Sequence, residues 1–468
     1  MSTRTAGNPG PAAAAAAKAS ANPLQTYLAA FERLKAGARG CGRNWLCDLR
    51  KEGFARFAEL GFPTTRDEEW KYTDVSPVAR LAFQPVLEPG LDGVTESVLR
   101  PFLLEGAAAR LVFVNGWFAP ALSAVDDLPA GVVAGSLAAA LAGEPEDVAS
   151  YLGRFAPHRA HPFAALNTAF LTDGALVRVP RGAVVAQPIH LLFVSTAPAA
   201  AVAPRLASPR NLLLAGTGSQ LAVVESYVGL GRGVYLTNAV TEILAEDGAV
   251  VDHVKIQDES DKAFHFATVQ VQQGRASQFV SHSISLGGAL TRNDLNAVFT
   301  EEGGECTLNG LYMAGGRQLV DNHTFIDHAR PNCTSHQLYK GVLDGKARAV
   351  FNGKIVVQPD AQKTNARQTN RNLVLSDDTV VNSKPQLEIF ANDVKCAHGA
   401  TVGQVDKDTL FYLRSRGLTQ AAARNLLTYA FAGEVLEDIR VRPTREHIAG
   451  LLARRLPGGP GAGEAMPS

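Results

Sequence analysis

Apolar residues follow a helical period near both ends of the chain and a strand-like alternation between them. Near the N-terminus, the apolar positions within Leu24–Leu34 share one face of a helix that Asn22 can cap. A second helix is predicted over Trp45–Leu60, with Gly61 as its stop signal. Residues 131–170 also have helical character. The first third of the chain is therefore predicted to be helical with some mixed structure.

From about residue 174 to 400 the helical period largely disappears. Short alternating segments recur there, for example at 173–177 and 247–251, with glycine or Asp-Gly between them. The intervals are too short to hold a crossover helix, which disfavours an alternating strand–helix architecture. Two architectures remain open, an antiparallel sandwich and a parallel β-helix in which each turn stacks on the previous one.

Two features of this region favour the β-helix, although its irregular repeat leaves the sandwich open. The region runs for roughly two hundred residues without a helical interruption, which is large for one sandwich. It is also rich in Asn, Gln, Thr and Ser at strand positions, above all within 362–372. Stacked strands let side-chain amides form ladders along the stack.

Helical periodicity returns near the C-terminus. Asp406 or Asp408 can cap a short helix that Gly417 ends. Thr419 then opens an amphipathic helix, and Thr444 caps a last one. The apolar stripe predicted for the helix that follows Thr419 consists of Ala422, Ala423, Leu426, Leu427, Ala430, Phe431 and Val435.

The pattern as a whole predicts a mainly β protein with helical regions on both sides of the β core. The five predicted segments are a disordered tail at 1–21, a helical and mixed domain at 22–170, the β core at 171–404, a helical domain at 405–456 and a flexible tail at 457–468. Both tails are low in complexity, with Ala, Gly and Pro dominating, which is typical of disorder.

Composition narrows the possible functions. The 468 residues include 45 basic and 45 acidic side chains, so the chain lacks the cationic field that drives binding to nucleic acid. No apolar run is long enough for a membrane span, and the N-terminus lacks the pattern of a secretory signal. The five cysteines are odd in number and scattered, which disfavours a disulfide framework. We expect a soluble protein of a reducing, cytoplasmic compartment, without nucleic-acid or membrane partners.

Common enzyme signatures are missing from the sequence. It has no glycine-rich Walker loop, which excludes ATP binding by that route, no His-Glu-x-x-His zinc helix and no Gly-x-Ser-x-Gly elbow. Cys41 and Cys47 do not match a zinc or iron–sulfur spacing, so we interpret them as packed residues of a helix. These signatures therefore give no support for the corresponding classes of enzyme.

Cys396 and His398 are the most suggestive pair. They are two residues apart, so on a strand both side chains leave the same face. A thiolate and an imidazole suit iron, zinc or an iron–sulfur cluster, but a closed tetrahedral site needs four ligands. The remaining ligands would come from elsewhere in the fold or from another subunit. The alternative is a buried cysteine next to a hydrogen-bonded histidine.

A second histidine-rich stretch, at 321–336, contains three His, two Asp and one Cys. The Asp327-His328 pair is out of phase with His323 on one strand, and Pro331 interrupts that strand. We therefore expect satisfied polar ladder residues here and not a metal site.

Two other segments have a functional and a structural interpretation. The acidic-aromatic run Asp67–Lys71 could anchor a partner, but a solvated helix end with a docked tryptophan is the commoner arrangement. The amphipathic helix after Thr419 could bind a partner, but helices of this kind more often face a core.

Several segments resemble the SufB/SufD family of the SUF machinery for iron–sulfur cluster assembly, and its SufD branch in particular. The matching segments are Glu69–Thr73, His161–Phe170, Asn382–Phe390, Asp393–Thr401 and Tyr412–Leu418. Within them, the stretch at 383–401 is the most specific, because SufB and SufD share it and few other proteins do. The chain has no Cys-x-x-Cys element of the kind typical of SufB, which favours the SufD branch.

The resemblance implies a right-handed parallel β-helix between helical terminal domains. It also implies a non-catalytic scaffold that pairs with SufB through the β-helix and docks the SufC ATPase through C-terminal helices at about 405–437. In the family, the Cys-x-His element lies at the SufB–SufD interface, and its histidine contributes to cluster assembly. By motif, these residues are His398 and Cys396, which would bind a nascent, transient iron–sulfur cluster shared with SufB. A homodimer could form when SufB is absent.

Two functions of other classes remain as alternatives. A self-contained β-helix metalloenzyme would use Cys396, His398 and the histidines within 323–336, and would hold metal without a partner. A polysaccharide-acting β-helix enzyme is disfavoured by the missing secretion signal.

Overall fold

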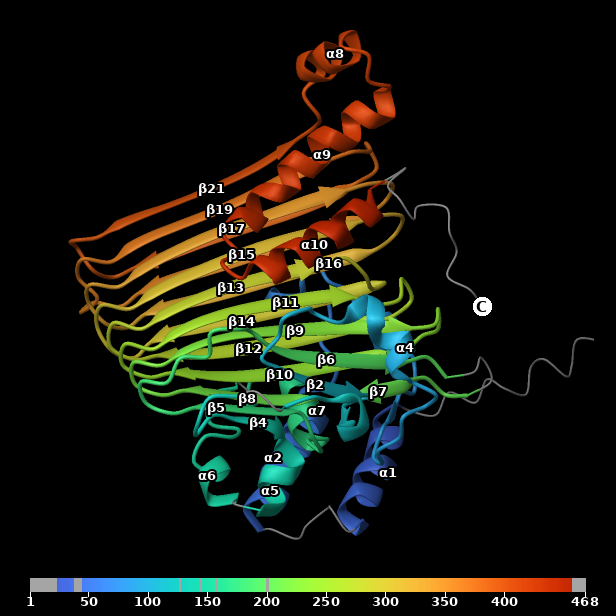
Figure 1. Cartoon of the computed structure of the whole chain (residues 1–468), viewed down its shortest axis with the longest axis vertical. Helices are drawn as coiled ribbons and strands as arrows, with labels where there is room; N and C mark the ends of the chain where they lie inside the picture. Colours follow the sequence, from blue (N-terminus) through green and yellow to red (C-terminus); the bar gives the residue numbers. More distant parts are fainter. Residues whose placement is uncertain are drawn as a thin grey trace, which may run out of the picture.

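The protein is a parallel β-helix with helices at both ends (Figure 1). Its structure is a computed structural model that describes residues 23–37, 44–125, 128–143, 145–156, 158–198 and 202–456. The two predicted tails, at 1–21 and 457–468, lie outside these residues. Within the described chain, no helix is long and apolar enough to cross a membrane.

Two sheets form the walls of the β-helix, and the chain passes from one to the other and back in every turn. Sheet A contains β1 (Gln84–Pro85), β4 (Val133–Ser136), β5 (Ala175–Val179), β7 (Arg205–Ala207), β8 (Arg210–Ala215), β10 (Leu236–Ala245), β12 (Phe264–Gln273), β14 (Leu290–Phe299), β16 (Leu319–His328), β18 (Arg348–Val357) and β20 (Val380–Ile389). Sheet B contains β2 (Ala109–Val114), β3 (Trp117–Phe118), β6 (Ile189–Thr196), β9 (Gln220–Leu230), β11 (Val250–Asp258), β13 (Gln278–Ser285), β15 (Glu305–Ala314), β17 (Thr334–Leu343), β19 (Asn365–Val374) and β21 (Lys395–Gly403).

Successive turns stack in parallel register. From β8 to β20 in sheet A, and from β6 to β21 in sheet B, each strand pairs in parallel with the strand one turn later. Leu236 pairs with Phe264, which in turn pairs with Leu290, so that one turn takes roughly 30 residues. The mainly β class and the parallel β-helix are confirmed, and the antiparallel sandwich is excluded.

Alternate side chains of both sheets fill the space between them, which we call the lumen. Most are apolar and form one continuous core, with members such as Val223, Ile243, Val269, Phe299 and Ile355. Polar side chains take part wherever they find partners on a neighbouring turn. Gln368 donates to Gln337 at 3.0 Å, so the predicted amide ladder is present inside the lumen.

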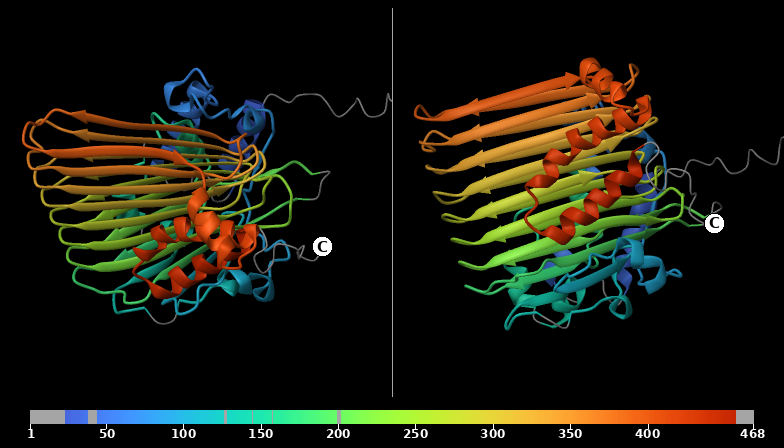
Figure 2. Two further views of the ribbon diagram at one scale, coloured as in Figure 1. Left: turned by 90° about the horizontal axis from the view of Figure 1, so that it is seen from above. Right: turned by 45° about the horizontal axis from the view of Figure 1, so that its top comes forward.

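Most of the N-terminal helices cover the outer face of sheet A, on the side of the β-helix opposite the C-terminal helices (Figure 2). This layer contains α1 (Pro23–Ala36), α2 (Asn44–Leu60), α3 (Ser76–Ala79), α5 (Leu137–Gly143), α6 (Pro145–Ala149), α7 (Pro162–Ala169) and the 3₁₀ helix η2 (Glu68–Trp70). In contrast, α4 (Glu96–Leu99) and the 3₁₀ helices η3 (Arg100–Phe102) and η4 (Pro120–Leu122) pack on the outer face of sheet B. Phe31 of α1, Phe57 of α2 and Phe163 of α7 pack in one cluster with Phe266 of β12. These aromatic contacts attach the helices to the sheet.

Several details of the predicted N-terminal elements can be compared with the structure. Both predicted helices are confirmed as α1 and α2, and Gly61 ends α2 with a φ of 64°. The expected cap Asn22 lies outside the described residues. The prediction of helix over 131–170 is only partly right, because β4 runs there as an antiparallel partner of β5. Cys47 is buried in α2 as expected and is disulfide-bonded, which was not expected.

The C-terminal helices are α8 (Lys407–Ser415), α9 (Gln420–Glu437) and α10 (Arg442–Arg455). The side chains of Asp406 and Thr419 cap α8 and α9 as predicted, and Gly417 follows α8 with a φ of 96°. Thr444 does not cap α10. It lies inside that helix and is buried, because α10 begins earlier, at Arg442, with a proline in its first turn.

The predicted stripe on α9 is only partly right: Ala423 and Val435 are buried and Phe431 packs on the core, but three other members are exposed. The side chains that face sheet B are Ala423, Thr428, Ala432, Val435 and Leu436, whereas Ala422, Leu426 and Ala430 are exposed. Together with α10, the inner face of α9 packs on apolar residues of sheet B such as Val254, Ile284 and Leu311. In contrast, α8 buries no side chain and projects from the end of the molecule (Figure 1).

Candidate functional site

The β-helix ends at β20 and β21, the last strands of the two sheets. Each pairs with only one described strand, β18 or β19, so the other edge of each carries backbone N–H and C=O groups without a strand partner. Edges of this kind are templates for pairing with another chain. Contacts between β20 and β21 bring the two edges together at one open end of the lumen.

Both predicted site residues lie on β21 at this open end. The register pairs Cys396 with Ala366 and His398 with Gln368, and these two β19 residues are buried in the lumen. Since paired residues of neighbouring strands point to the same face, Cys396 and His398 both project on the lumen side. The structure therefore places the pair on one face, as the two-residue spacing requires.

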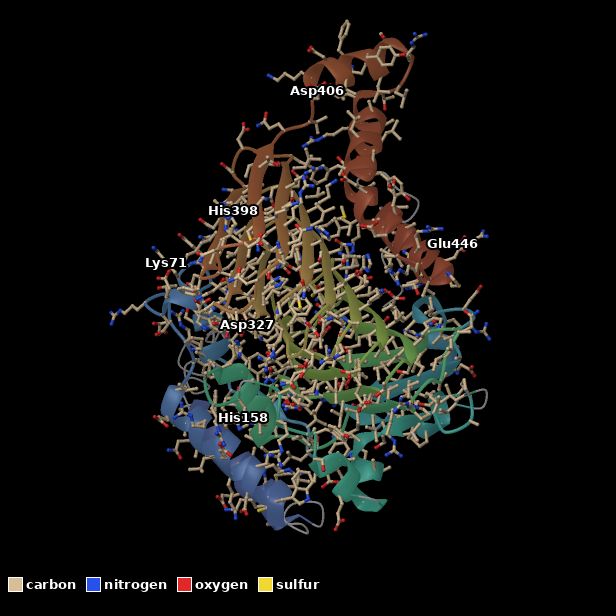
Figure 3. The ribbon with its side chains drawn as sticks, turned by 90° about the vertical axis from the view of Figure 1, so that its left-hand side faces the viewer. Lys71, His158, Asp327, His398, Asp406 and Glu446 are labelled. Carbon is tan, nitrogen blue, oxygen red and sulfur yellow. The ribbon has the colours of Figure 1, made fainter. Side chains whose placement is uncertain are left out.

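The two side chains differ in exposure. Cys396 is partly buried against the apolar lumen core, and this burial raises the pKa of its thiol. His398 is exposed and lies toward the same end of the molecule as Asp406, the cap of α8 (Figure 3). The pair thus offers a thiol that favours its protonated form and an accessible imidazole at the mouth of the lumen.

The histidine-rich stretch does not complete a metal site around this pair. Within the described ranges, no three His, Cys, Asp or Glu side chains are grouped so that they could hold a metal ion. His323 lies on the outer face of sheet A, His328 lies in the lumen 2.9 Å from Ser335 Oγ, and His336 lies on the outer face of sheet B. Asp327 shares the face of His323, which corrects the expected phase of that residue.

The acidic-aromatic motif attaches the N-terminal layer to sheet A. Trp70 is buried, and the guanidinium of Arg292 lies 3.6 Å from its ring centroid. Arg292 also donates to the carbonyl oxygen of Glu69 at 2.7 Å. His323 lies between two carboxylates, 3.4 Å from that of Glu69 and 3.0 Å from that of Asp321. The predicted docking of the tryptophan is confirmed. Glu69, which precedes it, contributes to the same attachment through its contacts with Arg292 and His323.

Electrostatics in this network favour the charged forms. Burial and the Arg292 guanidinium lower the pKa of His323, but the carboxylates of Asp321 and Glu69 outweigh them, so that its pKa is raised overall. Burial would raise the pKa of Asp294, but Arg292 and His161 outweigh it and hold that pKa well below the usual value. Ion pairs rather than a ligand site occupy this face of sheet A.

The sequence did not lead us to predict a buried cluster of ionisable residues inside the lumen. It consists of Glu225, His253, Lys255, Glu259 and His265, none of them more than 3% exposed. His253 lies 3.3 Å from Glu225, and His265 lies 2.7 Å from Glu259. Burial lowers the pKa of Lys255 to about 8, although both carboxylates act in the opposite direction. The sequence signal that could have predicted this cluster is the occurrence of charged residues at alternate strand positions that are otherwise apolar.

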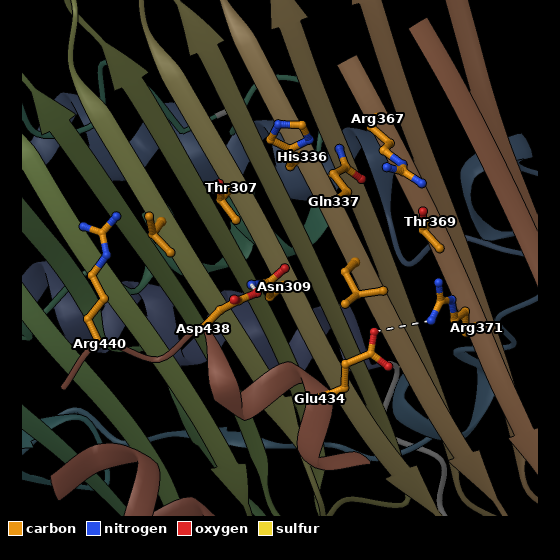
Figure 4. Close-up of a pocket in the computed structure, with 12 residues that line it drawn as sticks. Thr307, Asn309, His336, Gln337, Arg367, Thr369, Arg371, Glu434, Asp438 and Arg440 are labelled. Atoms are coloured by element: carbon orange, nitrogen blue, oxygen red, sulfur yellow. Dashed lines mark hydrogen bonds and ion pairs between the residues drawn. The ribbon is translucent and has the colours of Figure 1, made fainter. Parts of the chain in front are cut away.

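A groove of about 530 Å³ runs over the outer face of sheet B beside α9 (Figure 4). Arg367, Arg371 and Arg440 line it together with Glu434 and Asp438. Arg371 lies 3.3 Å from Glu434, an ion pair that ties α9 to β19. The acidic residues of the helix side offset part of the basic charge on the sheet side, so the groove has no single charge character.

Comparison with known protein families shows to which family the chain belongs. The family model described as "SUF system FeS cluster assembly, SufBD core domain" matches residues 196–431, which include the open end and the Cys396–His398 pair. The model described as "SufBD protein N-terminal region" matches residues 21–191. The chain belongs to the SufBD family. It is therefore an iron–sulfur cluster assembly protein, and the expected SUF-type resemblance is confirmed.

Individual SufBD relatives are similar over most of the chain. An iron–sulfur cluster assembly SufBD family protein of Synechocystis is 38% identical over 402 residues, which cover 84% of this chain and 87% of the relative. The iron–sulfur cluster assembly protein SufD of Escherichia coli is 31% identical over 440 residues, 94% of this chain and 98% of the relative. A chloroplastic protein of Arabidopsis thaliana is 31% identical over 404 residues, 84% of this chain and 83% of the relative.

Proposed function

We propose that this SufBD chain is a non-catalytic scaffold subunit of the SufD type in an iron–sulfur cluster assembly complex. It pairs with SufB through the open end of the β-helix and docks the SufC ATPase through its C-terminal helices. It presents His398, with Cys396 beside it, to a nascent cluster that is the cargo of the complex. The observation that carries the proposal is this two-donor pair at an open β-helix end. The expected compartment is the cytoplasm.

The incomplete donor set supports a site shared with another subunit. A closed tetrahedral site needs four ligands, whereas Cys396 and His398 supply two, one of them a thiol whose pKa burial raises. A metal ligand must be the thiolate, so Cys396 needs a nearby metal or cationic group to lose its proton. An accessible imidazole has no such requirement, which makes His398 the stronger donor in this chain.

The open end has the features of a protein interface. Along the free edges of β20 and β21, backbone groups have no strand partner among the described residues. Large apolar side chains are exposed on the two strands and just beyond β20. These exposed residues are Val380, Ile389, Phe390 and Val402. Another β-helix that ends in the same way would pair with these edges and cover the apolar side chains. A SufB partner stacked here would bring its own ligands to the mouth of the lumen.

The C-terminal helices offer a second, separate surface to SufC. Phe411 and Tyr412 of α8 are 72% and 54% exposed, and Leu426 and Tyr429 of α9 are also exposed. Exposed apolar patches on proteins often mark sites that contact another molecule, because burying apolar surface is worth about 25 cal/mol per Å². This surface lies on α8, which projects from the end of the molecule, and on the side of α9 that faces away from sheet B, so that SufC and SufB could bind together.

The first experiment replaces the proposed cluster donor. In a complex reconstituted from this chain, SufB and SufC, we expect His398→Ala to leave assembly of the complex intact but to reduce the iron and sulfide that the complex accumulates. His336→Ala, an exposed histidine on the outer face of sheet B, serves as the matched control and should behave as wild type. Iron and sulfide contents equal to wild type in the His398→Ala complex would overturn the assignment.

A self-contained metalloenzyme is the competing function, and metal analysis of the purified chain alone separates it from the scaffold. The structure keeps the histidines that such a site would use on three different surfaces. A scaffold should be isolated without stoichiometric metal. One metal ion per chain, retained through gel filtration, would favour the metalloenzyme.

A further inference from the structure

Three amide side chains of β19 face the lumen, and one of them differs from the others in its hydrogen bonding. Asn370 Oδ1 accepts from Asn372 Nδ2 and from Ser383 Oγ, both at 2.8 Å, while Asn370 Nδ2 donates to Tyr312 at 3.1 Å. Gln368 is equally buried, yet its Oε1 has no hydrogen-bond partner within the described part of the chain. A buried carbonyl oxygen without a donor is costly and therefore calls for an explanation.

The direction in which this oxygen points follows from the hydrogen bond that the same amide donates to Gln337. Gln368 Nε2 donates to Gln337 Oε1 at 3.0 Å, and the same oxygen accepts from Thr324 Oγ1 at 3.0 Å. With Gln337 presenting its oxygen, the amide nitrogen of Gln368 faces Gln337 and the amide oxygen faces away. Gln337 Nε2 is itself buried without a hydrogen-bond partner among the described residues. This ladder thus holds the orientation of Gln368 from one turn below.

A glycine across the lumen makes room for the same side chain. A Cβ placed on Gly353 of β18 would lie 2.1 Å from Gln368 Nε2 and 2.7 Å from its Cδ. Any other residue at 353 would displace the amide. The side chain of Gln368 is therefore held by close packing as well as by hydrogen bonds.

The residue directly above Gln368 in the next turn is His398. Both side chains point to the lumen, and neighbouring strands lie about 4.8 Å apart, within reach of a glutamine and a histidine. Asn370, whose amide is fully used, is instead covered by Ala400, which offers no side-chain donor. The unused acceptor and the exposed imidazole thus occur at the same lumen position, on successive turns.

We propose that Gln368 is a positioning residue that accepts the N–H of the His398 ring and thereby fixes its tautomer and orientation. The second ring nitrogen then keeps its lone pair directed away from Gln368 and toward the open end of the lumen. Ligating histidines generally depend on such an acceptor behind the ring. This inference rests on the proposed role of His398 and adds the residue that prepares it.

The test observes the ring directly in the purified full chain, without metal or partners. With the histidines labelled in ¹³C and ¹⁵N, nuclear magnetic resonance at alkaline pH reports the tautomer of each neutral ring, and His398→Ala identifies the signals. We expect Gln368→Met, which keeps the volume but removes the acceptor, to shift the tautomer ratio of His398 on the order of fivefold, as loss of one ordinary hydrogen bond would. An unchanged ratio would overturn the proposal.

Two further variants separate positioning from general damage to the lumen. Gln368→Glu is ionised at the alkaline pH of the measurement and still offers an acceptor oxygen to the ring N–H, so it should keep the same tautomer of His398 preferred. Gln273→Leu removes another buried lumen glutamine far from β21 and should leave the His398 signals unchanged. If Gln273→Leu alters the ratio as much as Gln368→Met does, the effect is structural and the proposal is wrong.

The reconstituted complex then distinguishes this inference from the proposed function. We expect Gln368→Met to lower cluster yield less than His398→Ala does. If the tautomer shifts while His398→Ala leaves cluster yield unchanged, Gln368 still positions the ring but the cluster role of His398 fails. If His398→Ala lowers the yield while the tautomer does not respond to Gln368→Met, the cluster role stands and the positioning role fails.

Discussion

At the scale of single residues, histidines of similar sequence context serve different purposes because of what surrounds them. His398 is exposed at the open end, whereas His323 is held between the carboxylates of Glu69 and Asp321. His328 is buried in the lumen, where burial lowers its pKa to about 4 and favours the neutral ring. Only the first of these three is placed to meet another molecule.

The attachment of the N-terminal layer through His323 should depend on pH. The pKa of His323 is raised in the folded chain, so the stabilisation that it provides is fully present below the ordinary histidine pKa and is lost as pH rises through the raised value. We expect His323→Asn to reduce the free energy of unfolding by about 1 kcal/mol more near pH 6 than near pH 9. Urea denaturation of both proteins at each pH measures this difference.

The pH comparison needs a control for general effects of removing a histidine. His336→Asn changes an exposed histidine on the opposite sheet and should cost little stability at either pH. A loss of stability in His323→Asn that is equal near pH 6 and near pH 9 would contradict the ionic attachment.

At the scale of elements, α9 shows how the same apolar residues divide between a core and a surface. Its inner residues pack on sheet B, and Lys340 of β17 donates to the carbonyl oxygen of Phe431 at 2.8 Å. This contact and the Arg371–Glu434 ion pair fix the rotation of the helix, which leaves Leu426 exposed on the other side. The helix therefore keeps an apolar face available although it is firmly attached.

The exposed face of α8 and α9 should be needed for SufC binding and dispensable for folding. We expect Phe411→Ser combined with Leu426→Glu to weaken binding to SufC by about 30-fold or more, since central apolar interface residues are often worth at least about 2 kcal/mol. Calorimetric titration of this chain with SufC gives the affinity, and thermal unfolding checks the fold. Val202→Glu replaces another exposed apolar residue, far from these helices in sequence, and should bind as wild type. Unaltered affinity in the double variant would show that SufC binds elsewhere.

At the scale of the whole molecule, the β-helix is held together by contacts between successive turns inside the lumen. Tyr312 of β15 lies against Gly341 of β17, where a Cβ would come within 2.2 Å of Tyr312 Cε2. The hydroxyl of Tyr312 donates to Asn372 at 2.6 Å, which prevents the ring from moving aside. Tyr312 and Tyr339 thus both lie where a neighbouring turn has a glycine, Gly341 and Gly310.

Filling this space should destabilise the whole β-helix. We expect Gly341→Ala to reduce the free energy of unfolding by about 1–3 kcal/mol, because neither the ring nor the backbone can relax freely. Gly403→Ala at the end of β21 is the control, since a Cβ there meets nothing within 4 Å. Denaturant unfolding followed by circular dichroism compares the two, and equal stability of both variants would show that the lumen packing is looser than described.

The sequence by itself determined the mainly β class, the helices near both ends, the caps at Asp406 and Thr419 and the shared face of Cys396 and His398. These follow from local rules, because caps, breakers and strand parity act over a few residues. Tertiary structure decided the rest. The rotation of α9, the docking of Trp70 on Arg292 and the free acceptor of Gln368 beneath His398 depend on residues brought together by the stacking of turns. Strand alternation gives the side a residue faces, but the register between distant turns decides which residue it meets.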